Sequence, residues 1–398
     1  TLTINLKGTY MNTLTPTQAV QLANLAYKAK SIKTTNLLHR SLHASLRDNF
    51  NFSVNPGAVQ GVTGGFFSHL FNLSTGFALV GHGLGDYQGD SVITIRGTNS
   101  LRDGLTDGHF GLSGGSNGSM VHAGFNKTFY SMKPALQEFV EANIKDKVTD
   151  CIHLVGHSLG GALATLSADW IRAEYSIPVK LYTFGSPRVG LENFSRAATS
   201  RIDKIYRCTH GADPVAKVPL WPFSHAPSSG QEIRLDNGQG LKGAAHTLNG
   251  TPGYINTANS NNWNNLTIQA NHFLSTPVRL KFEDRNQASF TSHWADKLGA
   301  ALVTLLKDAG YYSAVAAQAA IGTGLTFYDM LARTLDKIAK ASASFATQTL
   351  GLLGHMLVFA GKVISKAVEL TYSFIKSVFD STLGALYRAA REGLSGLD

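Results

Sequence analysis

The sequence predicts an α/β fold in which helices cover both faces of a mostly parallel central sheet. The first observation is that short apolar stretches alternate with helix-forming ones through the first two thirds of the chain. The second is residues 154–162 (LVGHSLGGA), a pattern typical of a strand, a tight turn with Ser158 at its tip, and a helix. The third is a late change to an alanine-rich helical pattern. We therefore expect a sheet-containing part over residues 1–294 and an α-helical region over residues 295–398.

The first expected helix covers Thr15–Lys30, because Thr15 can cap it, Pro16 suits the first helical position and Gln18 completes a capping box. The next elements, in chain order, are two hairpin strands at Gly76–His82 and Ser91–Arg96, a loop at Asp103–Ser119, a helix at Asn126–Ile144, a strand at Cys151–Val155, a helix at Ala162–Ala173, and strands at Val179–Phe184, Lys204–Cys208 and Glu232–Leu235. Asn249–Asn271, rich in Asn and Thr, is expected to be a long loop.

The C-terminal region carries amphipathic patterns from about Trp294 onward. In Lys362–Asp380, polar residues recur at steps of three and four, which predicts one helix with a wide apolar face. Ala341–Gly361 lacks Asp, Glu, Lys and Arg, although its polar side chains make it a weak candidate for a membrane span. We expect this region to cap a cleft, contact a membrane, or join a second copy or a partner protein; the alternative is a bundle that buries these faces internally.

The chain has a formal net charge of +9. A basic surface attracts anionic partners, but the sequence has no dense Lys/Arg run and no nucleic-acid motif, so we expect an anionic lipid surface and no nucleic acid. General solubility explains the charge equally well. The two cysteines, Cys151 and Cys208, fall in expected interior strands and are predicted to be buried thiols. Two cysteines do not form a zinc motif, and we expect no metal and no cofactor.

The first residues, Thr1–Gly8, lack a charged segment followed by an apolar one, so no Sec-type signal peptide is visible. Met11 is a candidate natural start. We expect a secreted protein, or one exported without a cleaved signal, that associates with a membrane in a target compartment.

Ser158 is the predicted nucleophile, because a serine between glycines on a strand–turn–helix matches the nucleophile elbow of α/β-hydrolases. Gly156 and Gly160 remove side chains that would collide across the turn. The helix that begins at Leu159 directs its amides at the place where an oxyanion would form. The acid is expected at Asp213, in a loop at the carboxyl end of a strand, since the chain order in such enzymes is Ser, acid, His.

The oxyanion hole needs a second donor from an earlier strand. Gly97 and Thr98 end the strand Ser91–Arg96, and Thr98 can offer both its amide and its hydroxyl. We therefore expect Thr98 and Leu159 to bind the oxyanion.

The base must be a histidine downstream of the acid; the candidates are His225, His246, His272 and His293. His293 directly precedes an amphipathic helix that Ser292 or Thr291 can cap, and a base held by a packed helix would be well positioned. We therefore expect His293 to be the base, with His272 next and the other two behind it.

These motifs together resemble the class 3 lipase family. The matching motifs, in chain order, are Arg96–Ser100 with Asp107 beyond it, Val121–Phe125, Gly156–Ala162, Thr183–Gly190, and Asp213–Val215 with Val218–Pro219. The resemblance covers roughly Thr15–His293 and implies an α/β-hydrolase in which Ser158 and Asp213 belong to the triad and Thr98 and Leu159 to the oxyanion hole. It also implies a lid at Leu101–Gly118, which here is rich in Gly and Asp rather than apolar.

The expected function is a serine carboxylic-ester hydrolase of the lipase or phospholipase A type, acting on lipid acyl esters at a membrane or micelle surface through an acyl-enzyme on Ser158. The basic charge favours phospholipid. The long helical tail is similar to that of larger bacterial lipase-like proteins, some of which are toxins delivered into rival cells. The alternatives are a non-lipid carboxylesterase and a membrane-perturbing toxin in which the helical tail dominates.

Overall fold

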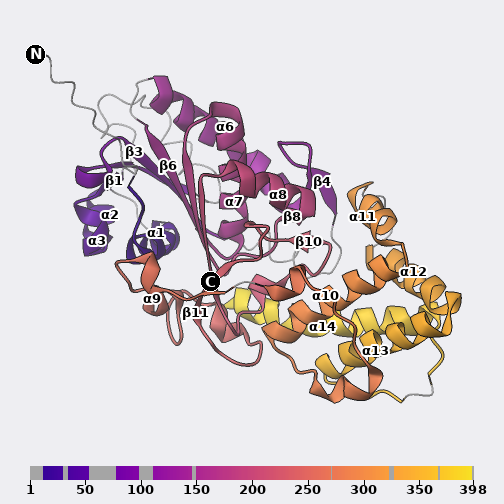
Figure 1. The fold of residues 1–398 in the computed structure, drawn as a ribbon. Coiled ribbons are helices and arrows are strands. Elements are labelled where there is room, and N and C mark those ends of the chain that lie inside the picture. Colours follow the sequence, from indigo (N-terminus) through magenta and orange to yellow (C-terminus); the bar gives the residue numbers. More distant parts are fainter. Residues whose placement is uncertain are drawn as a thin grey trace, which may run out of the picture.

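The computed structural model describes residues 12–29, 35–52, 78–97, 111–145, 149–269, 271–321, 327–365 and 368–396. Within them, the order of helices and strands follows the predicted alternation (Figure 1). Residues 101–110 of the lid segment expected at Leu101–Gly118 lie outside the described residues. The candidate oxyanion residue Thr98 also lies outside them.

The central sheet has eight strands in the order β1-β2-β3-β6-β7-β9-β11-β12. The strands are β1 Phe50–Phe52, β2 Ala78–Gly83, β3 Asp90–Ile95, β6 Cys151–His157, β7 Val179–Phe184, β9 Lys204–His210, β11 Glu232–Asp236 and β12 Ile268–Gln269. From β3 to β11 every neighbouring pair is parallel, whereas β1, β2 and β12 pair antiparallel at the two edges. The predicted mostly parallel sheet is therefore confirmed, and so is the hairpin of β2 and β3.

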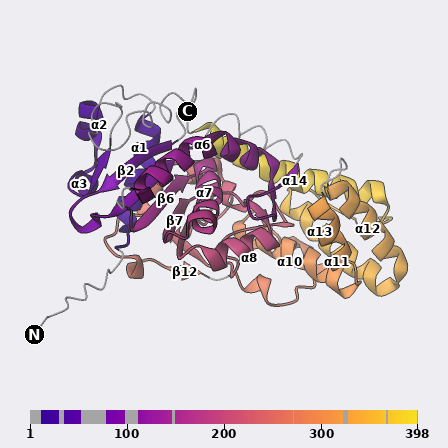
Figure 2. The same cartoon turned by 90° about the horizontal axis from the view of Figure 1, so that it is seen from above.

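Helices cover both faces of this sheet (Figures 1 and 2). They are α1 Pro16–Lys28, α2 Thr35–Ser41, α3 Ala44–Arg47, α6 Ala123–Lys145, α7 Leu159–Tyr175, α8 Glu192–Arg201 and α9 Tyr254–Thr257. Alternate residues of one strand face opposite layers: Val155 packs in the cluster of α1, and Leu154 packs in the cluster of α6 and α7. The capping box predicted for the first helix is present, with the Thr15 and Gln18 side chains bonded reciprocally to each other's backbone N–H.

A small second sheet lies beside the main one. Its strands, in spatial order, are β10 Phe223–Ser224, β8 Gly190–Leu191, β5 Met120–His122 and β4 Leu112–Gly114. The sequence did not predict it, because its strands are two or three residues long and too short to show a period.

Both cysteines are buried free thiols, as predicted.

Helices make up most of the C-terminal region. They are α10 Ser292–Asp308, α11 Tyr312–Ile321, α12 Phe327–Ala341, α13 Ala343–Phe359 and α14 Tyr372–Ser395. The predicted boundary after residue 294 falls inside α10, and Thr291, one of the two candidate caps, caps this helix. Asp296 of α10 joins this region to the segments that follow β7 and β9 by ion pairs with Arg188 (3.2 Å) and Lys217 (3.0 Å).

The single helix predicted over Lys362–Asp380 is wrong. The preceding helix α13 ends before Gly361, whose backbone adopts φ +74°, and α14 begins only at Tyr372, where the Thr371 side chain caps it. The described residues between them are not helical. The polar spacing there was not produced by a helix face.

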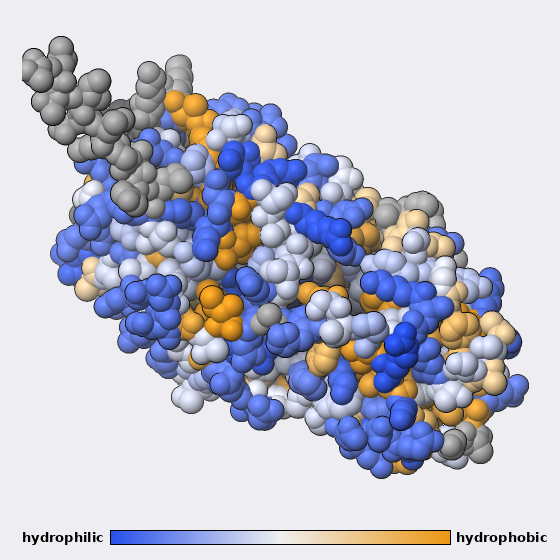
Figure 3. Space-filling model, viewed as in Figure 1, coloured by the Kyte–Doolittle hydropathy of each residue, from blue (hydrophilic) through white to orange (hydrophobic). Residues whose placement is uncertain are grey.

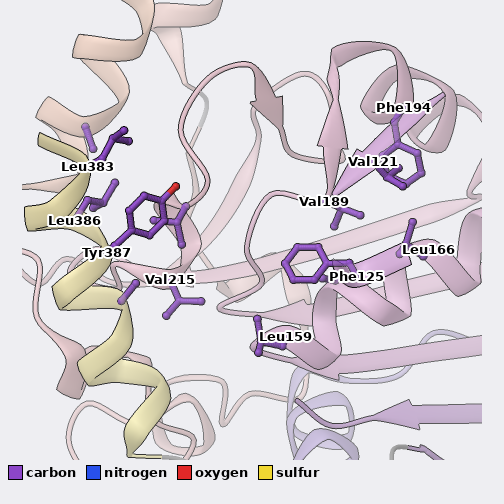
Figure 4. Packing of buried hydrophobic residues seen from close by; sticks show 14 of the residues in the cluster. Val121, Phe125, Leu159, Leu166, Val189, Phe194, Val215, Leu383, Leu386 and Tyr387 are labelled. Carbon is purple, nitrogen blue, oxygen red and sulfur yellow. The ribbon is translucent and has the colours of Figure 1, made fainter. Parts of the chain in front are cut away.

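The apolar faces of the C-terminal helices are buried in the same cluster as α6, α7 and the sheet. Figure 4 shows Leu383, Leu386 and Tyr387 of α14 on the side of the helix that faces Val215, Phe125 and Leu159, which belong to the same cluster. None of the helices in the part of the chain that the structure describes has the length and hydropathy of a membrane span. On the face shown in Figure 3, hydrophobic residues form separate patches among hydrophilic ones.

Candidate active site

Ser158, His246 and Asp213 form one hydrogen-bonded line. The Ser158 Oγ lies 2.7 Å from His246 Nε2, and the His246 Nδ1 lies 2.9 and 3.1 Å from the two carboxylate oxygens of Asp213. All three residues are fully buried. In this arrangement the Ser158 hydroxyl donates to Nε2 and the Nδ1–H donates to the carboxylate, the geometry that a serine nucleophile needs from a base and its orienting acid.

The backbone at Ser158 is strained in the way the elbow motif predicts. Ser158 has φ 59° and ψ −134° and lies between the end of β6 and the start of α7. A Cβ added at Gly156 would lie 2.3 Å from the Gly160 carbonyl oxygen, and one at Gly160 would lie 2.2 Å from the Ile95 carbonyl oxygen. Only glycine fits at either position, so both flanking glycines of the motif have the predicted steric role.

Asp213 lies in the loop after β9 and accepts hydrogen bonds on both carboxylate oxygens. The Val215 amide donates to Oδ1 (2.8 Å) and the Tyr254 hydroxyl donates to Oδ2 (2.7 Å). Burial alone would raise the pKa of Asp213, but the His246 imidazole and these two donors outweigh it, so the pKa lies below its ordinary value. The acid is therefore held in its charged form.

Gly185 lies directly behind the Asp213–His246 pair. A Cβ at this position would come within 2.6 Å of Asp213 Oδ2 and 3.0 Å of His246 Nδ1, and the backbone has φ +58°. The glycine of the Thr183–Gly190 motif thus leaves the space in which the acid and the base meet.

His246 ends a short 3₁₀ helix, η4 (Gly243–His246), whose carbonyls are bonded by two other histidines. The His210 Nδ1 lies 2.6 Å from the Ala245 carbonyl oxygen, and the His157 Nε2 lies 2.8 Å from the His246 carbonyl oxygen. Carbonyl oxygens only accept, so each of these ring nitrogens carries a proton. Two imidazole donors therefore fix the backbone that carries His246.

Tyr27 of α1 extends this network towards the end of β3. Its hydroxyl lies 3.1 Å from His157 Nδ1 and accepts a bond from the Gly97 amide at 3.3 Å. Burial lowers the pKa of His157 well below its ordinary value, with the neighbouring His246 adding to the effect, so the ring is neutral and Nδ1 can accept from Tyr27. A chain of hydrogen bonds thus connects the strand end before Thr98 with the loop of His246.

Of the two expected oxyanion donors, the structure describes Leu159. It is the first residue of α7, so its amide is at the positive end of the helix dipole, next to Ser158. A Cβ added at Gly97 would lie 3.6 Å from the Leu159 amide nitrogen, so the end of β3 approaches this donor closely. Thr98, the second expected donor, lies outside the described residues.

The predicted placement of His293 as the base is corrected by these contacts, which are made by His246 instead. His293 is exposed on the first turn of α10, and its ring contacts Phe273 and Trp294 edge-on. The start of α10 does contact the loop that carries Asp213, because the Ser292 hydroxyl donates to the Gly211 carbonyl oxygen. The neighbouring His293 side chain, however, does not point towards Asp213.

The other candidates also lie away from Ser158 Oγ. His272 is exposed at the start of a short 3₁₀ helix, and the His225 Nε2 is bonded to the Ala216 carbonyl oxygen at 2.8 Å. Sequence reasoning ranked His246 low because its Gly/Ala loop shows no local support. The support comes from His157, His210 and the C-terminal helix α14, all distant in sequence. The small residues before His246 were the only local signal, since they permit close packing.

One group of potential metal ligands occurs among the described residues, at the opposite ends of the strands. Asp90 and Cys151 begin β3 and β6, and His153 lies beside them. The His153 Nε2 lies 3.0 Å from Asp90 Oδ2, and its Nδ1 lies 3.2 Å from the Tyr182 hydroxyl. Burial raises the pKa of the Cys151 thiol to about 12. With the imidazole bonded at both nitrogens and the thiol protonated, we interpret this group as structural hydrogen bonding rather than a metal site.

Comparison with known sequences gives matches over the same part of the chain. Residues 92–223 match the family model described as lipase (class 3). A secreted mono- and diacylglycerol lipase 1 from Fusarium solani is 36% identical over 149 residues, covering 37% of this chain and 44% of the relative. A phospholipase A1-II 1 from Oryza sativa subsp. indica is 30% identical over 175 residues, covering 38% and 44%. The chain spans about half the length of the curated relatives it matches.

Solved structures of lipases resemble this chain more loosely. A mono- and diacylglycerol lipase from Aspergillus oryzae is 19% identical, with a TM-score of 0.44 over 64% of this chain and 85% of its own. Lipase II from Rhizopus niveus is 24% identical, with a TM-score of 0.40 over 55% and 78%. The sequence match includes the elbow with Ser158 and the loop with Asp213. Over residues 92–223 the chain is therefore similar to the class 3 lipase family.

Proposed function

We propose that this protein is a serine carboxylic-ester hydrolase that cleaves lipid acyl esters. The observation that carries the proposal is the buried line of Ser158, His246 and Asp213, with contacts of 2.7 and 2.9 Å between neighbouring polar atoms. The match of residues 92–223 to the class 3 lipase family model supports the same reaction class.

In the proposed reaction, Ser158 Oγ attacks the acyl carbonyl carbon while its proton passes to His246 Nε2. Asp213 keeps the other ring proton on Nδ1 and stabilises the imidazolium that forms. The carbonyl oxygen becomes an oxyanion, which the Leu159 amide is positioned to bind, with Thr98 as the second donor.

The ester C–O bond then breaks, and the imidazolium gives its proton to the leaving alcohol. Water, deprotonated by the same His246, attacks the acyl-Ser158 ester and releases the fatty acid, and the serine regains its proton. Apart from substrate and water, every step uses groups of this chain, and Thr98 is the one residue named in the reaction that the structure does not describe.

We infer that the substrates are glycerolipid esters. The relatives' names include both mono- and diacylglycerol lipases and phospholipases A1, and the net charge of +9 favours an anionic lipid surface and hence phospholipid. Relatives named as secreted support action outside the cell that makes the protein, with membrane association in a target compartment as the finer proposal.

We propose that residues 1–294 form the catalytic part and residues 295–398 a helical region that completes it. Burial of the apolar helix faces in the core shared with the sheet supports a packed cap. Contact with a membrane, a second copy or a partner protein through these helices is the alternative, and vesicle flotation and sedimentation of the full chain distinguish the two.

The test is hydrolysis of phosphatidylglycerol vesicles, diacylglycerol emulsions and a short soluble nitrophenyl ester by wild type and Ser158→Ala. We expect wild type to prefer the lipids and the variant to match the blank while keeping its unfolding midpoint. Undiminished turnover in Ser158→Ala would reject the proposal. Preference for the soluble ester would indicate a non-lipid carboxylesterase, and dye release from vesicles by the variant would indicate a membrane-perturbing protein.

A further inference from the structure

The last turn of α14 lies against the loop that carries His246. The helix runs from the C-terminal region back to the sheet and contacts both η4 and the segment after Asp213 (Figures 1 and 2). Gly393, near its end, is buried. The helix therefore contacts the loop that carries His246 and the segment that follows Asp213.

The contact is closest between two glycines. A Cβ added at Gly393 would lie 2.9 Å from the His246 Cβ and 3.2 Å from the Gly243 carbonyl oxygen. A Cβ added at Gly243 would lie 2.5 Å from the Gly393 nitrogen and 2.7 Å from the Glu392 Cβ. Helix and loop are thus packed with no room for a methyl group, and the helix backbone lies directly behind the side chain of the base.

This contact completes the support of η4. The His157 and His210 imidazoles hold its carbonyl oxygens, and the Lys242 amide donates to the Ala212 carbonyl oxygen at 3.0 Å. These bonds fix the backbone of the loop from the side of the sheet. The helix α14 adds a further contact to this loop, at the His246 Cβ and the Gly243 carbonyl oxygen.

The same helix also packs against the acid's loop. The helix contacts η3, which begins at Val215, and the Val215 amide donates to Asp213; Leu383, Leu386 and Val215 belong to one buried cluster (Figure 4). One helix thus contacts both the loop that carries the base and the segment that follows the acid.

We propose that Gly393 is a positioning residue for the base: by bringing the α14 backbone against His246 and Gly243, it fixes the reach of the imidazole to Ser158 and Asp213. The inference rests on the proposed ester hydrolysis. It makes the C-terminal region part of the catalytic apparatus rather than an appended module.

The test is Gly393→Ala in the full-length chain. To restore an ordinary contact of 3.4 Å or more, His246 must move by about half an ångström, because the methyl group would otherwise lie 2.9 Å from its Cβ. Displacements of about 1 Å cost on the order of 100-fold in rate, so we expect kcat to fall on the order of 10-fold while KM stays within about twofold. The rate at which a fluorophosphonate labels Ser158 should fall in parallel.

Gly384→Ala is the matched control. It lies on the same helix, and its added Cβ would meet only the end of the flexible Arg388 side chain, at 3.6 Å. Alanine is the better helix former, so this variant should keep wild-type kcat and unfold at the same or a slightly higher temperature. Gly243→Ala adds a methyl group to the same contact from the loop side, so its kcat should fall to a similar extent as that of Gly393→Ala.

Equal kcat in Gly393→Ala and Gly384→Ala would overturn the inference while leaving the proposed function intact. So would failure of both Gly393→Ala and Gly243→Ala to fold, because the contact would then serve folding rather than positioning. A wild-type protein without hydrolysis or labelling would overturn the proposed function as well.

Discussion

Tyr254→Phe removes one hydroxyl from the network behind the base and leaves the ring in place. The Tyr254 hydroxyl donates to Asp213 Oδ2 at 2.7 Å and accepts from the His210 amide at 3.1 Å, and all three residues are buried. A hydrogen bond to a charged group contributes about 1.5–3 kcal/mol, and burial leaves little solvent to replace it. We expect the free energy of unfolding at pH 7 to fall by about that amount.

The loss should depend on pH in a defined direction. The folded-state pKa of Asp213 lies below its ordinary value of 3.8, so the charged carboxylate stabilises the fold above that value, and the contribution is lost as pH falls through the folded pKa. Without the hydroxyl, the folded pKa rises towards the ordinary value. The stability difference between wild type and variant should therefore be full at neutral pH and shrink below 3.8.

Denaturant unfolding at several pH values, together with kcat for ester hydrolysis, measures both effects. Tyr87→Phe is the control, since it removes a buried hydroxyl that bonds Gln18 and the Thr13 carbonyl, away from the base. We expect it to lower stability by about 0.5–1.5 kcal/mol without changing kcat. A loss in Tyr254→Phe below about 0.5 kcal/mol at pH 7, or one that does not depend on pH, would refute the reasoning.

Asp296→Ala should destabilise by about 1.5–3 kcal/mol in denaturant unfolding, because it removes a carboxylate shared by Arg188 and Lys217, and Lys217 keeps only the more distant Glu232 at 3.8 Å. Asp308→Ala breaks a more exposed pair with Arg279 and should cost no more than about 1 kcal/mol. Similar losses in the two variants would contradict the role assigned to the buried pairs. Gly185→Ala should abolish ester hydrolysis in the same assay, because the added Cβ would lie 2.6 Å from Asp213 Oδ2. Gly240→Ala is the control: Gly240 also has a positive φ, but a Cβ there would have no neighbour within 4 Å, so this variant should keep full activity.

The sequence predicted the parts of the site that depend on neighbours in the chain. The elbow around Ser158 is a local structure, because the glycines that make the turn possible flank the serine directly. Asp213 was found from its place after a strand that the periodicity identified. The capping box of α1 likewise lies within four residues.

His246 was not found, because nothing within its own segment holds it. Its loop is fixed by His157, by His210 and by Gly393 of a helix near the C-terminus, and no local pattern indicates such contacts. The start of α14 was predicted wrongly for a different reason: polar residues at helical spacing continued back to Lys362, although the Thr371 side chain caps the helix and begins it at Tyr372. Tertiary packing decided the position of His246, whereas a local cap decided the start of α14.

The most direct test of the account is which histidine activates Ser158. The measurement is the rate at which a fluorophosphonate labels wild type, His246→Ala and His293→Ala, with the labelled peptide identified by mass spectrometry. We expect the label on Ser158, a rate in His293→Ala within about twofold of wild type, and near-complete loss in His246→Ala, because removing the base of such a unit costs most of its activity. Wild-type labelling in His246→Ala, or loss confined to His293→Ala, would contradict the account.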